Sequence, residues 1–230
     1  MARKARDTAV ALLVLAVTAT SAAGCGGSGS KKAAPKPVVE TTLNGWTASK
    51  LGGMLLTTGD VPGYKARTAP PVRTPTTSRS VSDQCREFTD ASLQIASGLG
   101  SAPVAETALT GTGTAQKEYG ASVFVRAYAS PDAAAQAVTA YRDGMAKCGR
   151  GVVAVPDPGL GDKSAGYVAG TMEPGGFGGV AVQVGALTVG VQVTHQGTSK
   201  PDAEILKEQL KAIAQKQVDK LRAAQPPAAA

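Results

Sequence analysis

The chain has few of the residues that most often carry chemistry. Its 230 residues include one histidine, three cysteines and one tryptophan, and aromatic residues make up only 4% of them. It contains no HExxH, GxSxG or complete GxGxxG pattern, and no cysteine has the cysteine or histidine neighbours that a metal site requires. The sequence therefore predicts a protein that is not an enzyme and that holds no metal or other cofactor.

A dense basic stripe is also missing. The formal net charge is +7, but bases such as Lys65, Arg67, Arg73 and Arg79 are scattered along the chain and are not interleaved with aromatic residues. A nucleic-acid-binding protein concentrates its bases on one face. We therefore expect no nucleic-acid partner, and the mild excess of bases suits anionic lipids or cell-wall polymers.

Two short features come nearest to a catalytic signal. Gly161-Asp162-Lys163-Ser164 has the lysine and serine of a phosphate-binding loop, but Asp162 stands where that loop needs glycine and a predicted strand follows in place of a helix. His195 stands alone at the end of a predicted strand, where we expect a solvated surface residue. Neither feature predicts catalysis.

The apolar run near the N-terminus is too short to span a membrane. It extends from Thr8 to about Ala22, below the roughly 20 residues that a membrane-spanning helix needs. Arg3, Lys4 and Arg6 precede it and small residues follow it, which is the layout of a secretory signal. The sequence thus predicts an exported protein.

The residues that end this signal, Ala22-Ala23-Gly24-Cys25, resemble a bacterial lipobox, with Ala22 in the place of the usual leucine. Two acyl chains on such a cysteine hold a protein stably on a membrane. We expect a signal peptide at 1–24, a diacylglyceryl anchor on Cys25 and a flexible tether over 25–45. The mature lipoprotein then lies on the outer face of the cytoplasmic membrane, exposed to the cell wall. The alternative is ordinary cleavage, which leaves Cys25 as a free thiol.

The remaining chain has the length of one domain, 46–222, and we expect the tail at 223–230 to be disordered. Cys85 and Cys148 form an even pair in an exported domain, which favours a disulfide. Each lies on the apolar stripe of a predicted helix, so the bond joins two helices. A redox switch is the alternative.

Hydrophobic periodicity predicts an α+β fold with an antiparallel sheet that amphipathic helices cover on one face. The clearest hairpin lies at 178–195 and turns near Gly185-Ala186, because apolar residues alternate on both sides of that turn. The other expected elements are a short helix ending near Thr57, helices at 82–100, from Ser130 to Cys148 and from about Ser199, and strands at 104–113, 120–130 and within 155–172.

Four aromatic residues are candidates for a cleft between the sheet and the helices: Tyr119, Tyr128, Tyr167 and Phe177. Pockets in this class of fold form on an uncovered sheet face. The alternative is that these rings belong to the core, as most aromatic residues do.

Three stretches together carry a resemblance: "LLTTGDVPGY", "ASPDAAAQAV" before Cys148, and "GLGDKSAGY". They are similar to sequences of actinobacterial lipoproteins related to the extracellular sensor domain of PknH-type Ser/Thr kinases. The resemblance implies an extracytoplasmic α+β domain with a cleft for an envelope ligand, and it implies no catalytic residues.

These observations lead to one functional hypothesis with two alternatives. The hypothesis is a membrane-anchored extracytoplasmic lipoprotein that acts as a ligand-binding or sensor-like module of the envelope. The alternatives are a carrier of lipid or glycolipid with an apolar cavity, and an adaptor that docks to another envelope protein. The small and polar residues that alternate along the hairpin, such as Ala181, Gln183 and Thr188, look solvated and so argue against the carrier.

Overall fold

A computed structural model of the chain describes residues 41–68, 85–96, 102–148, 151–155, 157–170 and 175–224. The predicted signal peptide, Cys25 and most of the predicted tether and tail lie outside these ranges. Among the helices in these ranges, none combines the length and the apolar character needed to cross a bilayer.

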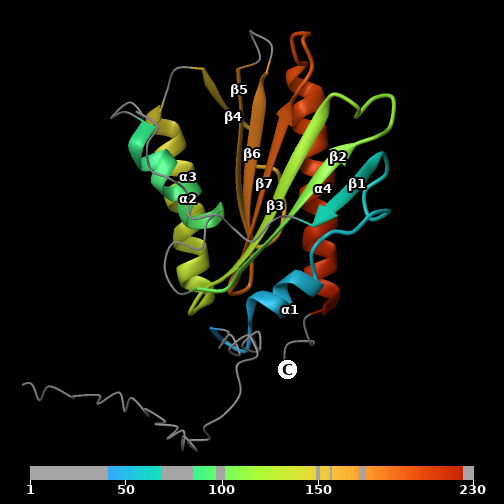
Figure 1. Cartoon of the computed structure of the whole chain (residues 1–230). Coiled ribbons are helices and arrows are strands. Elements are labelled where there is room, and N and C mark those ends of the chain that lie inside the picture. The colour runs from blue at the N-terminus through green and yellow to red at the C-terminus, as the bar shows by residue number, and fades with distance from the viewer. Residues whose placement is uncertain are drawn as a thin grey trace, which may run out of the picture. The chain divides into compact units, whose positions relative to one another are not determined.

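The centre of the fold is an antiparallel sheet of seven strands, in the order β1-β2-β3-β7-β6-β5-β4 (Figure 1). The predicted hairpin forms its middle, since β6 and β7 turn at Gly185 and Ala186. This arrangement confirms the predicted fold class. The strands are β1 (Tyr64–Thr68), β2 (Val104–Gly111), β3 (Tyr119–Ala127), β4 (Val152–Val155), β5 (Lys163–Ala169), β6 (Phe177–Val184) and β7 (Leu187–His195).

Four helices accompany the sheet: α1 (Ala48–Gly53), α2 (Arg86–Ala96), α3 (Pro131–Cys148) and α4 (Ala203–Ala224). The start of α3 is as predicted, because the Ser130 hydroxyl accepts the Ala133 N–H at 3.1 Å and proline occupies the first turn. The Asp202 carboxylate caps α4 by accepting the Glu204 N–H at 2.8 Å. The long helix α3 thus begins at its predicted residue, whereas α4 begins a few residues after the predicted start near Ser199.

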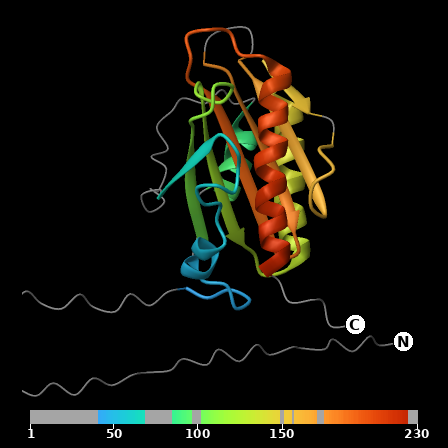
Figure 2. The same cartoon turned by 90° about the vertical axis from the view of Figure 1, so that its right-hand side faces the viewer.

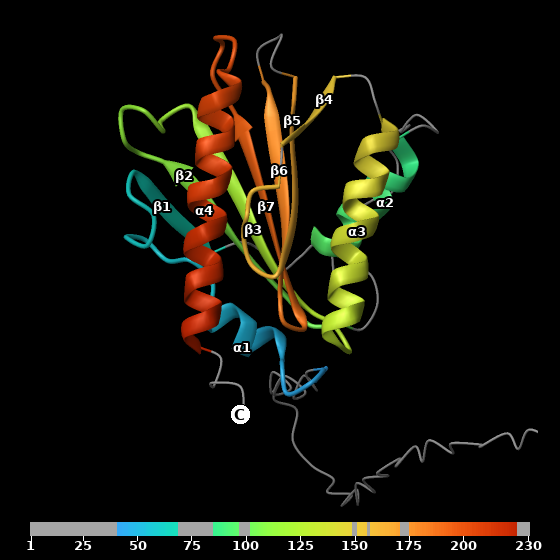
Figure 3. The same ribbon diagram turned by 180° about the vertical axis from the view of Figure 1, so that it is seen from behind.

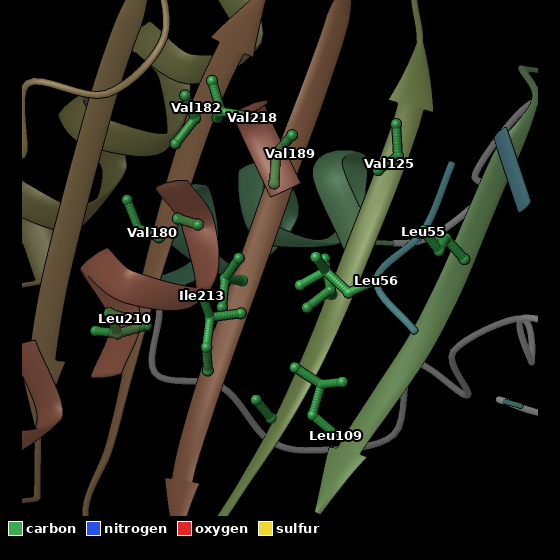
Figure 4. Packing of buried hydrophobic residues seen from close by; sticks show 14 of the residues in the cluster. Leu55, Leu56, Leu109, Val125, Val180, Val182, Val189, Leu210, Ile213 and Val218 are labelled. Atoms are coloured by element: carbon green, nitrogen blue, oxygen red, sulfur yellow. The ribbon is translucent and has the colours of Figure 1, made fainter. Parts of the chain in front are cut away.

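One face of the sheet is covered by α4, which runs along β6 and β7 (Figure 2). Its buried stripe of Leu206, Leu210, Ile213, Val218 and Leu221 packs against valines of the strands (Figure 4). This burial is aliphatic and extensive, and hydrophobic area is the main source of its stability.

The short helix α1 packs on the same face, and a buried amide ties its end to α4. The Gln217 side chain accepts the Leu56 N–H at 3.1 Å and donates to the Met54 carbonyl at 2.9 Å. Lys220 adds an ion pair with Asp60 at 2.7 Å in the turn after α1. The first and last described elements are thereby joined directly.

The opposite face is covered by α2 and α3, which the Cys85–Cys148 disulfide joins (Figure 3). Helices therefore lie on both faces of the sheet, where the sequence predicted one. The physical reason is the small residues of β6 and β7, since Ala181 is buried and Ile95 of α2 sits directly over Gly190. The sequence predicted that Ala181, Gln183 and Thr188 are solvated. In the structure all three are buried under protein.

The strand β4 is a second difference from the prediction. It follows α3 after the positive-φ residue Gly151 and pairs along its whole length with β5. Its four residues are Val152, Val153, Ala154 and Val155, a run too short and too uniformly apolar to show alternation. It lies at one edge of the sheet, and this position makes it important for the site described next.

Candidate binding site at the β4–β5 edge

The four aromatic residues predicted for a cleft do not share one site. Tyr167 and Phe177 lie together on the α2/α3 face, with ring centroids 6.0 Å apart in an edge-to-face arrangement. Tyr119 lies in the other core, on the α4 face, with its ring centroid 5.1 Å from that of His195. Strand alternation within β3 and β5 separates these rings, because the register across the sheet puts Tyr119 and Tyr167 on opposite faces.

The buried phenols behave as core residues. Burial raises the pKa of Tyr167 to about 12 and raises that of Tyr141 well above its ordinary value, so both hydroxyls stay protonated. Burial also raises the pKa of Tyr128, which follows β3 and has the Arg126 guanidinium 5.3 Å from its ring centre. None of these groups is prepared for acid–base chemistry at neutral pH.

His195 is buried, contrary to the expectation of a solvated surface residue. Its side chain is 2% exposed, and its Nε2 atom lies 3.1 Å from a carboxylate oxygen of Glu118. The Ser199 hydroxyl donates to the same oxygen at 3.3 Å. The Glu118 carboxylate thus holds the His195 ring and the Ser199 hydroxyl in place beside Tyr119, shortly before α4 begins.

A hollow of about 210 Å³ lies on the α4 face, between that helix and the β5 side of the sheet. We call it the α4-side hollow; Val155, Gly166, Val180 and Leu210 give it an apolar lining, and Lys207 and Lys211 stand at its helical wall. Asp157 and Pro158 also line it, as does Glu208 of α4.

Two glycines explain why the α4-side hollow exists. A Cβ atom on Gly178 would lie 2.7 Å from the Leu210 Cδ1 atom, so α4 rests directly on the strand there. A Cβ atom on Gly166 would meet only atoms of the sheet, the nearest being the Gly179 carbonyl oxygen at 3.3 Å. The helix therefore touches β6 and departs from the sheet over β5, and the gap becomes the hollow.

A second hollow of about 380 Å³ lies on the other face, between α3 and the strands β4 and β5. This α3-side hollow has an apolar wall from Val138 and Met145, and its polar lining includes Arg142, Lys163 and Ser164. Both hollows are also lined by Val155, Asp157 and Gly166. They therefore flank the β4–β5 edge, one on each face.

The charged groups around the two hollows differ in how they are compensated. Arg142 pairs with Asp143 at 2.9 Å, and Lys207 pairs with Glu204 at 2.6 Å. Lys163 donates to the Thr139 hydroxyl at 2.6 Å, but within the described ranges neither Lys163 nor Lys211 has a carboxylate partner. Each hollow thus holds one lysine without a carboxylate partner in these ranges, although carboxylates also line it, Glu208 in the α4-side hollow and Asp162 in the α3-side hollow.

The loop that connects the hollows is held by its own hydrogen bonds. Asp157 accepts the Ser164 hydroxyl at 2.6 Å and the Gly159 N–H at 3.1 Å, and these bonds lower the pKa of its carboxyl. No cluster of metal-ligating side chains is present in the part of the chain that the structure describes. The arrangement suits binding, because its charged groups are fixed around apolar surface.

This site was not predicted from the sequence. The two hollows depend on where α3 and α4 leave the sheet, which is decided by helix packing far along the chain. The one local signal is Gly166 inside a predicted strand, since an isolated glycine there often marks a close approach or a gap.

Comparison with known proteins gives a family. No curated protein matches the chain by sequence. Among solved structures, the chain is similar to the crystal structure of the extracellular domain of PknH from Mycobacterium tuberculosis, with 15% identity and a TM-score of 0.48 over 76% of this chain and 96% of that one. The family of PknH-like extracellular domains matches residues 46–196, which is more than half of the chain. On that sequence match, the chain belongs to the family of PknH-like extracellular domains and is an extracytoplasmic, sensor-like module.

Proposed function

We propose that the chain is a membrane-anchored extracytoplasmic module that binds an envelope ligand at the β4–β5 edge and catalyses no reaction. The observation that carries the proposal is the pair of hollows that meet at Val155, Asp157 and Gly166 in a domain of this family. Apolar linings with a few fixed polar groups are typical of binding sites.

The sizes of the hollows favour a small ligand or a few side chains over a lipid with two acyl chains. Ligand pockets commonly have volumes of about 300–1,000 Å³. At about 210 and 380 Å³, each hollow alone stands below or near the lower end of that range. This argues against the carrier alternative and supports a sensor-like module.

The non-catalytic role is supported by the state of the polar groups. The buried phenols are held protonated, Asp157 is engaged by two hydrogen bonds, and His195 lies in a buried cluster away from both hollows. These groups stabilise structure. The lysines at the hollows offer charge for recognition.

Ligand binding is tested by thermal unfolding of the purified chain with envelope extracts separated into lipids, wall fragments and peptides. A ligand that binds the folded state raises the unfolding midpoint by mass action. We expect one class of extract to raise it, and the rise to be smaller in Lys163→Gln and Lys211→Gln but unchanged in Lys216→Gln, an exposed lysine away from the hollows. If no extract raises the midpoint, the binding proposal is wrong.

Anchoring is tested separately by fractionation of cells that express the chain. Cys25→Ser removes the thiol that would carry the diacylglyceryl group. We expect the wild-type chain in the membrane fraction and the variant in the soluble fraction. Retention of the variant on the membrane would contradict the lipid anchor and leave the binding proposal unaffected.

A further inference from the structure

The two edges of the sheet differ in how they are protected. Among the described residues, β1 pairs only with β2, and β4 pairs only with β5. β1 carries the exposed charges Lys65 and Arg67, which natural proteins use to prevent pairing with another chain. β4 carries no charge, and the Val153 residue is 56% exposed. β4 is therefore an edge that lacks this protection.

The side chains of β4 point alternately to the two faces of the sheet, and Ala154 and Val155 among them line the hollows. Val153 and Val155 pair with Val168 and Gly166 and share the α4 face with them. Val152 and Ala154 pair with Ala169 and Tyr167 on the α2/α3 face. A strand added beside β4 would send its own side chains to the same two faces in turn.

We propose that the free edge of β4 binds an extended peptide segment of a partner protein, which adds an eighth strand to the sheet. This inference rests on the proposed function, because it names the ligand class for the β4–β5 edge. Main-chain hydrogen bonds to β4 supply affinity, and the hollows on the two faces select alternate side chains.

The lining of the hollows defines the chemistry of the peptide. The α4-side hollow is apolar through Val155, Val180 and Leu210, so it takes an aliphatic side chain. The α3-side hollow contains Lys163, which has no carboxylate partner among the described residues. The two carboxylates that line the same hollow are engaged elsewhere, Asp157 by the Ser164 hydroxyl and Asp162 by Arg222 and the Gly185 N–H, so the hollow takes a glutamate or aspartate. The fitting segment alternates aliphatic and acidic residues.

A second copy of the chain fits this edge less well. Its own β4 is Val152-Val153-Ala154-Val155 and brings no carboxylate to Lys163 or Lys211. A four-residue edge also buries little area compared with the roughly 1,200 Å² or more of a stable interface. We therefore assign the edge to an acidic peptide and treat self-association as an outcome of the test.

The probe is a short fluorescein-labelled peptide in which valine and glutamate alternate, titrated with the full chain and followed by fluorescence anisotropy. Two control peptides separate the contribution of main-chain hydrogen bonds from that of the acidic side chains. One has methylated backbone nitrogens and donates no main-chain hydrogen bonds, and the other has lysine in place of every glutamate. We expect saturable binding of the probe and no measurable binding of either control.

Variants of the chain locate the binding edge. Val153→Lys gives β4 the kind of charge that protects β1, and we expect it to weaken probe binding by about tenfold or more. Val153→Thr keeps the β-branched side chain and should bind within about twofold of the wild type. Because Val153 is exposed, neither change should move the unfolding midpoint, which circular dichroism checks. Lys163→Gln should weaken binding by a few-fold and Lys216→Gln should not.

Three results would overturn the inference. The first is equal binding of the methylated peptide, and the second is unchanged binding by Val153→Lys. The third is a concentration-dependent dimer in light scattering that Val153→Lys abolishes and the probe does not displace. If the peptide fails while an envelope extract still raises the unfolding midpoint, only this inference falls. If both fail, the proposed function falls with it.

Discussion

The two faces of the sheet are held by different means. On one face a helix of 22 residues packs an aliphatic stripe against valines of β6 and β7, beside the short helix α1. On the other face a helix of 11 residues and one of 18 residues enclose a group of aromatic rings and share a disulfide. The long helix is held by its buried aliphatic side chains, whereas the shorter α2 has in addition a covalent bond to α3.

The two faces also differ in the kind of contact that holds their helices. At the contact between α2 and α3, a Cβ atom on Gly144 would lie 2.7 Å from the Phe88 backbone nitrogen. Such a contact leaves no room for adjustment, because backbone atoms stand on the other side. The α4 face instead contains buried polar bonds, chiefly those of Gln217. One face is therefore sensitive to added volume and to reduction, and the other to loss of specific hydrogen bonds.

The largest expected effect is loss of the disulfide. Cys85 and Cys148 are 63 residues apart, and on the chain-entropy model closing such a loop stabilises the folded state by about 4 kcal/mol. We expect Cys85→Ser, Cys148→Ser and the double variant to lower the free energy of unfolding by similar amounts, measured by urea denaturation. Additive losses would show that the sulfurs act separately and not as one bond.

A second prediction concerns the contact between α2 and α3. Gly144→Ala should cost about 2 kcal/mol net, since overpacking against backbone costs about 3 kcal/mol and alanine returns about 1 kcal/mol of helix propensity. The matched control is Gly53→Ala in α1, where a Cβ atom meets nothing within 4 Å and stability should hold or rise. Equal effects of the two changes in urea denaturation would contradict the close contact.

The corresponding test of the α4 face removes a hydrogen bond. Gln217→Leu leaves the Leu56 N–H buried without its acceptor, and we expect a loss of about 1.5 kcal/mol in the free energy of unfolding. Gln209→Leu is the control, because Gln209 is half-buried and accepts the Tyr64 hydroxyl at 3.0 Å, far from the Leu56 N–H. Hydrogen exchange should show faster exchange at Leu56 in the first variant and not in the second.

The smallest effect is a dependence on pH. The Lys220 ammonium, with hydrogen bonds from Thr57, holds the pKa of Asp60 at about 2, below its ordinary value of 3.8. The contribution is present above pH 3.8 and is lost as the pH falls through 2. Because both side chains are about one-third exposed, we expect it to reach only about 1 kcal/mol. Asp60→Asn should be less stable than the wild type at pH 6, and the two should converge near pH 2.

The elements with clear periodicity were predictable from the sequence. The start of α3 at Ser130 and Pro131, the β6–β7 turn and the buried stripe of α4 all follow from local signals. The disulfide was predictable because both cysteines lie on apolar helix stripes. These predictions succeeded where the residues that decide the structure are close together in the chain.

The remaining features depend on contacts between distant residues. Ala181 and Gly190 were interpreted as solvated, but their small size is what lets α2 and α3 approach the second face. The prediction of one cleft for Tyr119 and Tyr167 is wrong. Alternation tells which side chains of one strand share a face, but it does not relate β3 to β5, which β7 and β6 separate. The β4–β5 edge was missed, since its hollows follow from the path of α4 over Gly178 and away from Gly166.

The bond between α1 and α4 has a mechanical consequence. A pull transmitted along the chain from the residues before 41 first reaches Asn44, whose side chain donates to the Tyr128 and Ala129 carbonyls after β3. It then reaches α1, which Gln217 and Lys220 tie to the C-terminal helix. The load is then shared with a helix that lies flat along the sheet, before it acts on β1 at the edge. A domain built in this way can be pulled from its N-terminal side while its strands keep their register, and β4 lies at the edge of the sheet farthest from β1.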